Sequence, residues 1–221
     1  MNPGAVADLL GPALSVMLGG LAGFLALPAL ILASGRFGAE IAAPVTQITE
    51  LVNAGAERIA QALLALLALL IGITVVARYG FGVGSNLLQE SALYAHALAF
   101  LLAAPAALGR DGHVRVDVFY ARFSARGKAL VNLGAFAVFA APMLIAILHF
   151  SGPYVAASWR IGERSAEADG LPLLFVLKTA IPVFCVLLLA QALAQACRAA
   201  CILRGLDPAL TRFGPDEERP G

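Results

Sequence analysis

NLLQESALYAHALAFLLAAPAALGRDGHVRVDVFY, residues 86–120, is an apolar run followed by a dense charged loop. Its apolar part, residues 87–108, is about 33 Å long as a helix, enough to cross the roughly 30 Å hydrocarbon core of a bilayer. Glu90 and His96 lie inside this run. Because ionisable groups in a membrane span are costly, they usually face other helices or mark function. We therefore predict a transmembrane helix that packs against partners, followed by a polar anchor.

The composition of the whole chain extends this interpretation. Of its 221 residues, 60% are hydrophobic and 13% are charged, and the mean hydropathy is +0.85. A soluble domain does not have these values, so we predict a polytopic membrane protein. The formal net charge of +1 provides no basic domain that could neutralise phosphates, which argues against a nucleic-acid partner.

The apolar runs predict an all-α membrane bundle with four core transmembrane helices and an extra N-terminal one. The core helices are expected at about 60–77, 87–108, 129–150 and 171–203, within a domain that covers residues 44–204. Residues 1–43 contain the N-terminal span, 9–33, which has no basic segment before it and is therefore interpreted as retained rather than as a cleaved signal. The tail, residues 205–221, is expected to be disordered.

The segment that leads into the first core span is amphipathic. Apolar side chains recur at helical spacing on one side, and polar side chains occupy the other: Val45, Ile48, Leu51, Val52 and Ile59 against Gln47, Glu50, Asn53, Glu57 and Arg58. This pattern predicts a helix at the membrane surface, or alternatively a soluble connecting helix.

Lys and Arg residues are distributed unevenly between alternate connections. One side of the four core spans holds eleven of them: Arg36, Arg58, Arg110, Arg115, Arg122, Arg126, Lys128, Arg198, Arg204, Arg212 and Arg219. The opposite side holds Arg78, Arg160 and Arg164. By the positive-inside rule, we predict that the loop 109–128 and the C-terminus are cytoplasmic. If residues 9–33 also span, the N-terminus lies outside.

Three charged residues fall near the outer face in this topology. Arg78 ends one span, Glu90 begins the next, and Lys178 lies inside the last. Because an unpaired charge is costly there, we predict that Glu90 pairs with Lys178 or Arg78. The alternative is that each side chain reaches the headgroups separately.

The charged loop after residue 108 offers a second group of candidates. His113 lies between Asp111 and Asp117, residue types that can bind a metal or transfer protons. The alternation of acids with Arg110 and Arg115 favours a solvated loop that satisfies its own charges. These five residues, with Arg78, Glu90 and Lys178, are our candidates for structural or interface roles, and no metal site is expected.

Residues for catalysis are few. His96 and His149 could flank a haem, but hydrogen-bonded bundle residues are the favoured interpretation. Cys185, Cys197 and Cys201 are interpreted as packing residues rather than ligands, because two thiols on one helical face do not fill a zinc shell. No catalytic or nucleotide-binding motif is found, and the chain lacks the two matching halves of inverted-repeat carriers. We therefore expect an accessory subunit with no enzymatic activity and no cofactor.

Five strings resemble one transporter family: RYGFG (78–82), QE (89–90), GRDGHVRVDVFYARFS (109–124), YVAASW (154–159) and GLPLLFVLKTAIP (170–182). Over residues 45–203 the chain resembles the small integral-membrane subunit of tripartite ATP-independent periplasmic (TRAP) transporters. It is most similar to the branch labelled for mannitol, chloroaromatic compounds or related organic acids. Leu87 stands where the family commonly has Trp, and the span 9–33 lies outside the usual four-helix core.

The resemblance implies a lipid-embedded subunit of a sodium-coupled, binding-protein-dependent secondary transporter for an organic acid in the bacterial inner membrane. It implies a large permease subunit that holds the substrate and sodium sites, and a periplasmic binding protein that docks partly on residues 80–86 and 151–170. The small subunit would brace the large one and transport nothing alone. The alternatives are a stand-alone haem or redox bundle, and an assembly factor without a transport partner.

Overall fold

The computed structural model describes residues 3–110, 112 and 120–211, with side chains described from residue 12 onward except residue 13. In this part of the chain the regular structure is helical: α1 Pro3–Ser34, α2 Arg36–Phe81, α3 Asn86–Gly109, α5 Ala125–Ala135, the π-helical turn η1 Phe136–Ala140, α6 Ala141–Ile161, α7 Leu174–Arg204 and the 3-10 helix η2 Pro208–Thr211. Since α5, η1 and α6 run on continuously, the described residues form five helices long and apolar enough to cross a membrane. The predicted all-α membrane bundle with five spans is confirmed.

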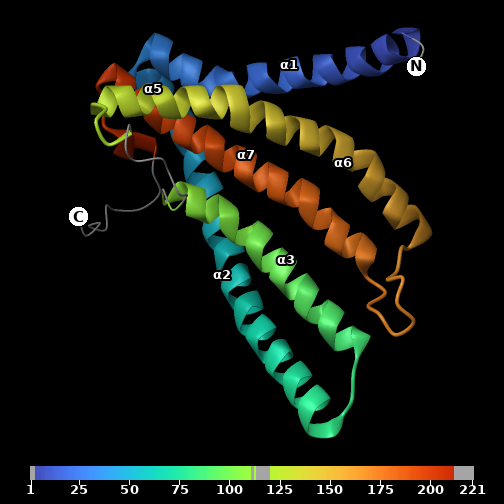
Figure 1. Ribbon diagram of the computed structural model, residues 1–221. Helices are drawn as coiled ribbons and strands as arrows, with labels where there is room; N and C mark the ends of the chain where they lie inside the picture. The colour runs from blue at the N-terminus through green and yellow to red at the C-terminus, as the bar shows by residue number, and fades with distance from the viewer. Residues whose placement is uncertain (1–2, 111, 113–119, 212–221) are drawn as a thin grey trace.

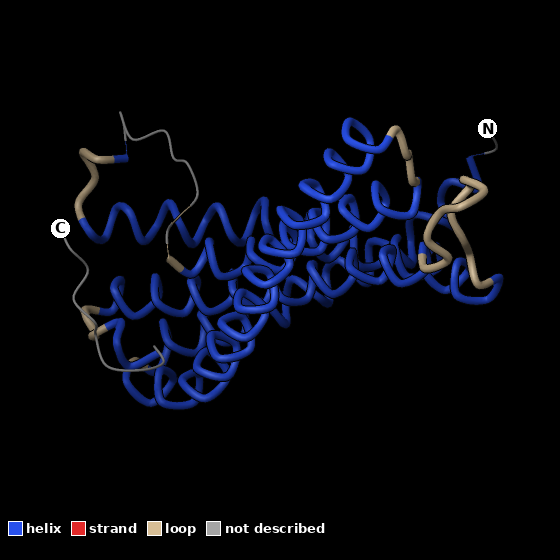
Figure 2. Tube along the Cα trace, turned by 90° about the horizontal axis from the view of Figure 1, so that it is seen from below, coloured by secondary structure: helices blue, strands red, loops and turns tan. Residues whose placement is uncertain are grey.

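Helix α7 lies at the centre of the bundle and packs against α1, α2, α3, α5 and α6 (Figure 1). The helices gather at one end and spread toward the other (Figures 1 and 2). We call the first the converging end, which holds the turn at Gly35, the C-termini of α3 and α7, and the start of α5. The diverging end holds the turn 82–85 between α2 and α3 and the connection 162–173 between α6 and α7.

Small residues allow the helices to approach closely at the converging end. One buried cluster joins α1, α2 and α7: Ile31, Ala39, Ala42, Cys197, Ala200 and Cys201. At Gly38 a Cβ atom would lie 2.6 Å from the carbonyl oxygen of Leu30, so only glycine fits this α1–α2 turn. Close backbone approach through small residues is the usual way in which membrane helices gain van der Waals contact.

The first half of α2 presents its polar face to the bundle. Thr46, Asn53 and Ala60 are buried on the inner side, whereas the apolar side chains predicted to share one face are exposed: Val45, Ile48, Leu51, Val52 and Ile59. Helix α2 continues without a break from this segment into the span and is about 69 Å long. The amphipathic pattern is therefore real, but its polar side is satisfied by other helices.

Two predicted boundaries need correction. Helix α6 ends at Ile161 rather than near residue 150, because the polar residues that follow Phe150 continue the helix until Gly162 adopts a left-handed conformation. The predicted disordered tail is ordered up to Thr211, since Leu206 and Leu210 pack on the α1–α2–α7 cluster and Thr211 is fully buried. Residues 212–221 lie outside the described part.

Candidate functional site

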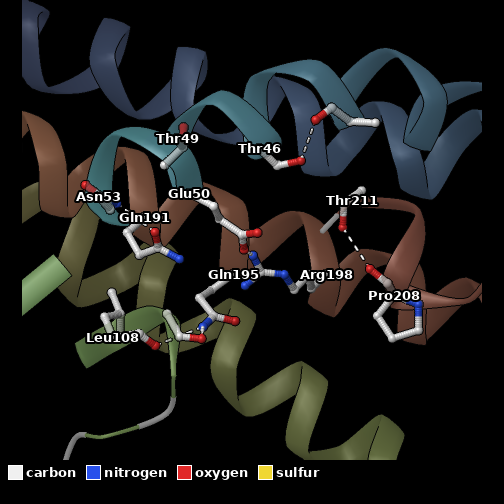
Figure 3. Close-up of polar contacts among 12 residues, drawn as sticks. Thr46, Thr49, Glu50, Asn53, Leu108, Gln191, Gln195, Arg198, Pro208 and Thr211 are labelled. Carbon is white, nitrogen blue, oxygen red and sulfur yellow. Dashed lines mark hydrogen bonds and ion pairs between the residues drawn. The ribbon is translucent and has the colours of Figure 1, made fainter. Parts of the chain in front are cut away.

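A buried amide pair connects α2 to α7 at the converging end (Figure 3). The side-chain amide of Asn53 donates to Oε1 of Gln191 over 2.7 Å, and the two residues are 2% and 1% exposed. The backbone of Gly109 lies against Gln191, because a Cβ atom at Gly109 would come within 2.9 Å of Nε2. The pair is thus enclosed by α2, α3 and α7.

Gln195, one turn further along α7, binds the end of α3. Its Nε2 donates to the carbonyl oxygens of Leu108 at 2.9 Å and Gly109 at 3.2 Å (Figure 3). The last carbonyls of a helix have no partner within it, so this side chain satisfies two groups that would otherwise need water. The contact fixes the C-terminus of α3 to α7.

Two ion pairs at this end join α2 to other segments, and both use acids of α2. Glu57 accepts from both terminal nitrogens of Arg110, with Nη1 and Oε2 2.5 Å apart. Glu50 pairs with Arg198, whose side chain is 6% exposed. The hydrogen bond from Arg110 to the Glu57 carboxylate raises the pKa of the guanidinium above its ordinary value. Helix α2 is therefore bound through its acids to both α3 and α7.

Glu90 organises the connection 162–173 at the diverging end. Its carboxylate accepts the backbone N–H of Leu171 over 2.6 Å and the hydroxyl of Ser165. Gly170 passes close beneath it, since a Cβ atom there would lie 2.7 Å from Oε2. A carboxylate that accepts two donors from one loop holds that loop against α3.

Lys178 forms a second contact with the same connection. Its ammonium donates to Glu163 over 2.5 Å and lies 4.1 Å from the ring centroid of Tyr154. The hydrogen bond from Lys178 lowers the pKa of the Glu163 carboxyl below its ordinary value. Thr179, the residue after Lys178, accepts a hydrogen bond from the indole N–H of Trp159 over 2.8 Å. These contacts join α6 to α7 where the two helices enter the connection.

The predicted pairing of Glu90 with Lys178 or Arg78 is therefore wrong. Glu90 is satisfied by the connection, and Lys178 binds Glu163 instead. Arg78 is exposed, and among the described residues no hydrogen bond or ion pair is found for it. The prediction compared the charges by their positions along the spans and left out the polar groups of the connection, which are the ones within reach of Glu90 and Lys178.

Four of the eight candidate residues cannot be placed. Asp111, His113, Arg115 and Asp117 lie outside the described residues. Of the candidates in that loop, Arg110 is the one with a described side chain, and its partner is Glu57.

The two histidines considered for a haem are not brought together. His96 is on α3 and His149 is on α6, and α7 lies between these helices (Figure 1). His96 is exposed, whereas His149 is half-buried with its ring edge 5.0 Å from Phe150. The three cysteines are free and buried, and Cys197 and Cys201 share one cluster as predicted. Among the described residues, no three of His, Cys, Asp and Glu are grouped so that they could hold a metal.

The most buried polar contacts were missed from the sequence. Asn53 was assigned to the polar side of an interfacial helix, and Gln191 and Gln195 were not considered. The spacing of these two glutamines, four residues apart within the last apolar run, was the available signal, because it predicts one polar face on a helix that is otherwise apolar. The described polar side chains at both ends hold segments together and do not converge on a space where a substrate could react.

Residues 67–202 match the family model described as tripartite ATP-independent periplasmic transporters, DctQ component. No curated protein and no solved structure matched the chain. The family match covers more than half of the sequence, so the chain belongs to the DctQ family, the small membrane subunit of TRAP transporters. The resemblance to this family, inferred from five short strings, is confirmed, whereas the predicted branch for mannitol, chloroaromatic compounds or related organic acids stays a prediction. Helix α1 and about the first two-thirds of α2, up to residue 66, precede the matched region.

Proposed function

We propose that this chain, as the DctQ component of a TRAP transporter, braces the large permease subunit of a sodium-coupled, binding-protein-dependent system for an organic acid. The family match over residues 67–202 is the observation that carries the proposal. The chain performs no transport alone, because its described polar side chains do not converge on a space that could hold a substrate. Substrate and sodium are bound by the large permease subunit.

The bracing role is supported by the shape of the bundle. At the converging end, α2 is fixed to α3 and α7 by Glu57, Glu50 and Asn53. Toward the other end, where the helices spread, large apolar side chains such as Val76 and Phe100 are exposed. A rigid body with broad apolar faces is suited to support a moving partner in the membrane.

The connection 162–173 is the proposed docking surface for the periplasmic binding protein, together with the turn 82–85. Glu90 and Lys178 hold the connection in one conformation. Its charged side chains Arg164, Glu167 and Asp169 are exposed. A surface that is already ordered loses less conformational entropy when a partner binds. The bias of Lys and Arg toward the converging end supports an orientation with that end in the cytoplasm of the bacterial inner membrane.

Reconstitution of defined subunits tests the function. We expect sodium-driven uptake of an organic acid in proteoliposomes that contain this chain, the large permease subunit and the binding protein. We expect none with this chain alone. Flux by this chain alone would contradict the proposal, as would full flux by the other two components without it. A reporter inserted in the loop 109–128 tests the orientation, and activity only outside the cytoplasm would contradict it.

A further inference from the structure

Helix α3 carries an exposed stripe on the side away from the bundle. Its members follow one another at spacings of four, three and four residues, the repeat of one helical face: Gln89, Leu93, His96 and Phe100. Leu93 and Phe100 are 59% and 67% exposed. The inner face of the same helix holds Ala95 and Ala99, which are buried. We call the four exposed residues the α3 stripe.

His96 is in an unusual position for a membrane protein. It is the eleventh of the 24 residues of α3, close to the middle of an apolar span. Among the described residues it has no hydrogen-bond or ion-pair partner. Two hydroxyls of the spans, by contrast, have partners within their own helix: that of Thr74 donates to the carbonyl of Leu70 over 2.7 Å, and that of Ser91 to the carbonyl of Leu87 over 2.7 Å.

Lipid tails cannot form hydrogen bonds with His96. Hydrocarbon tails contain no donor or acceptor, whereas an imidazole has one of each when neutral and two donors when protonated. Ionisable residues in spans therefore almost always face protein or a water-filled cavity. Since the bundle of this chain leaves His96 exposed, a second polypeptide that covers it would supply the missing hydrogen-bond partner. Leu93 and Phe100, on either side of the histidine, provide apolar contact area for a helix that lies along the stripe.

We propose that the α3 stripe is the surface on which a transmembrane helix of the large permease subunit packs, with a hydrogen-bonding group of that helix facing His96. This inference rests on the proposed function, which supplies the partner. It adds the face of the small subunit that binds the partner and the polar contact that sets the register. Helix α3 is free to bind in this way, because its opposite face is already packed on α2 and α7.

The first experiment measures recovery of the large permease subunit, co-expressed with this chain and isolated through a tag on this chain. His96→Leu is expected to lower recovery about three- to tenfold, the range of interhelical hydrogen bonds in membranes. His96→Gln, which keeps a donor and an acceptor, is expected to restore it. His149→Leu is the matched control, because His149 is half-buried on α6 with its ring against the neighbouring Phe150, and it should leave recovery unchanged.

The isolated chain provides a second readout. His96→Leu should not lower its melting temperature in detergent, because no described contact of the bundle is lost. A lower recovery that came only from misfolding of the chain would appear here as a lower melting temperature, and it would overturn the assignment of His96 to the interface.

Photo-crosslinking locates the partner. Benzoyl-phenylalanine at Leu93 or Phe100 is expected to crosslink to the large permease subunit, whereas the same group at Val138 or Phe139, exposed on the far side of α7, is not. Crosslinks to lipid only, or to a second copy of this chain, would overturn the assignment of the stripe. Failure of the wild-type chain to recover the large subunit would instead contradict the proposed function. Equal recovery with wild type and His96→Leu would contradict the stripe alone.

Discussion

The two ends of the bundle use polar side chains differently. At the converging end, side chains from one helix bind side chains or carbonyls of another: Asn53 binds Gln191, and Glu50 binds Arg198. At the diverging end, Glu90 and Lys178 bind the connection 162–173. The first arrangement fixes the angles between helices, and the second fixes the shape of a surface loop. One end is built as a scaffold and the other as a face that can meet a partner.

The two ends also differ in how deeply their polar contacts are buried, and therefore in the stability that a lost contact costs. Asn53, Gln191 and Arg198 are all nearly inaccessible, whereas the Glu163 side chain that pairs with Lys178 is 28% exposed. If one partner is removed inside the bundle, the polar group of the other stays buried without a hydrogen bond. In the exposed loop, water can take the place of the missing partner. We therefore expect substitutions at the converging end to affect the whole fold and those at the diverging end to act locally.

Substitution of the buried Arg198 should have the largest effect on stability of all the changes at the two ends. Arg198→Met removes the guanidinium that pairs with the half-buried Glu50 carboxylate, and we expect a loss of about 3 to 5 kcal/mol in the free energy of unfolding. Unfolding in detergent micelles, followed by far-UV circular dichroism against denaturant, measures it.

The double variant Glu50→Gln/Arg198→Met is the informative companion, because it removes both charges together. We expect it to recover a large part of the lost stability. Arg58→Met, at an exposed position on the same helix as Glu50, is the control and should change stability by less than about 0.5 kcal/mol. A single variant no worse than the double would show that the pair is not desolvated.

Replacement of glycine by alanine at one position of each end allows a direct comparison of the two ends. In Gly38→Ala the new Cβ would meet the backbone of α1, 2.6 Å from the Leu30 oxygen, and backbone cannot move aside cheaply. We expect a cost of about 1 to 3 kcal/mol in unfolding free energy. In Gly170→Ala the new atom meets Oγ and Cβ of Ser165 and Oε2 of Glu90, and the connection that carries Ser165 can shift as a loop, so the cost should be smaller. A larger effect at Gly170 would reverse the assignment of scaffold and loop.

Run length and composition were sufficient to predict the five spans, because the hydrocarbon thickness sets a minimum length that few soluble helices share. They did not predict where the helices end. Residues 151–161 are more polar than the preceding span, yet they continue α6, since Trp159 binds Thr179 of α7. The segment 205–211 is ordered for a similar reason, because Leu206 packs on a buried cluster formed by distant parts of the chain.

The polar contacts were harder to predict than the helices. Counting residues from a membrane surface gives the depth of Glu90 and Lys178, but neither the rotation of each helix nor the path of the connection between α6 and α7. Both charges therefore have partners that depth alone could not identify. The exposure of His96 likewise depends on the rotation of α3, which follows from packing of Ala95 and Ala99 rather than from the periodicity of a helix apolar on all sides.

The carboxylate of Glu90 tests whether the connection is held locally. In Glu90→Gln the amide can accept one of the two hydrogen bonds from Leu171 and Ser165 but presents a donor to the other, so one is lost. We expect a change of about 1 kcal/mol confined to the connection. Limited digestion with trypsin after Arg164 should become severalfold faster, while global unfolding shifts little. Asp169→Asn, at an exposed acid of the same connection, is the control, and an equal acceleration there would contradict the role of Glu90.

The ion pair between Lys178 and Glu163 should give the smallest effect, and its pH dependence has a definite sign. Because Lys178 lowers the pKa of Glu163 in the folded chain, the unfolded chain binds that proton more tightly, and protonation favours unfolding. The contribution is therefore fully present above the ordinary value of 4.5 and is lost as the pH falls below it through the lowered pKa.

Trp159 is the single tryptophan of the chain and lies beside the pair, so its fluorescence can follow the titration. Between pH 7 and 5 we expect no change, and below that range we expect a step that is absent in Glu163→Gln and weaker in high salt. A step that persisted in this variant would have to come from another carboxylate, and the local character of the diverging end would then not extend to this pair.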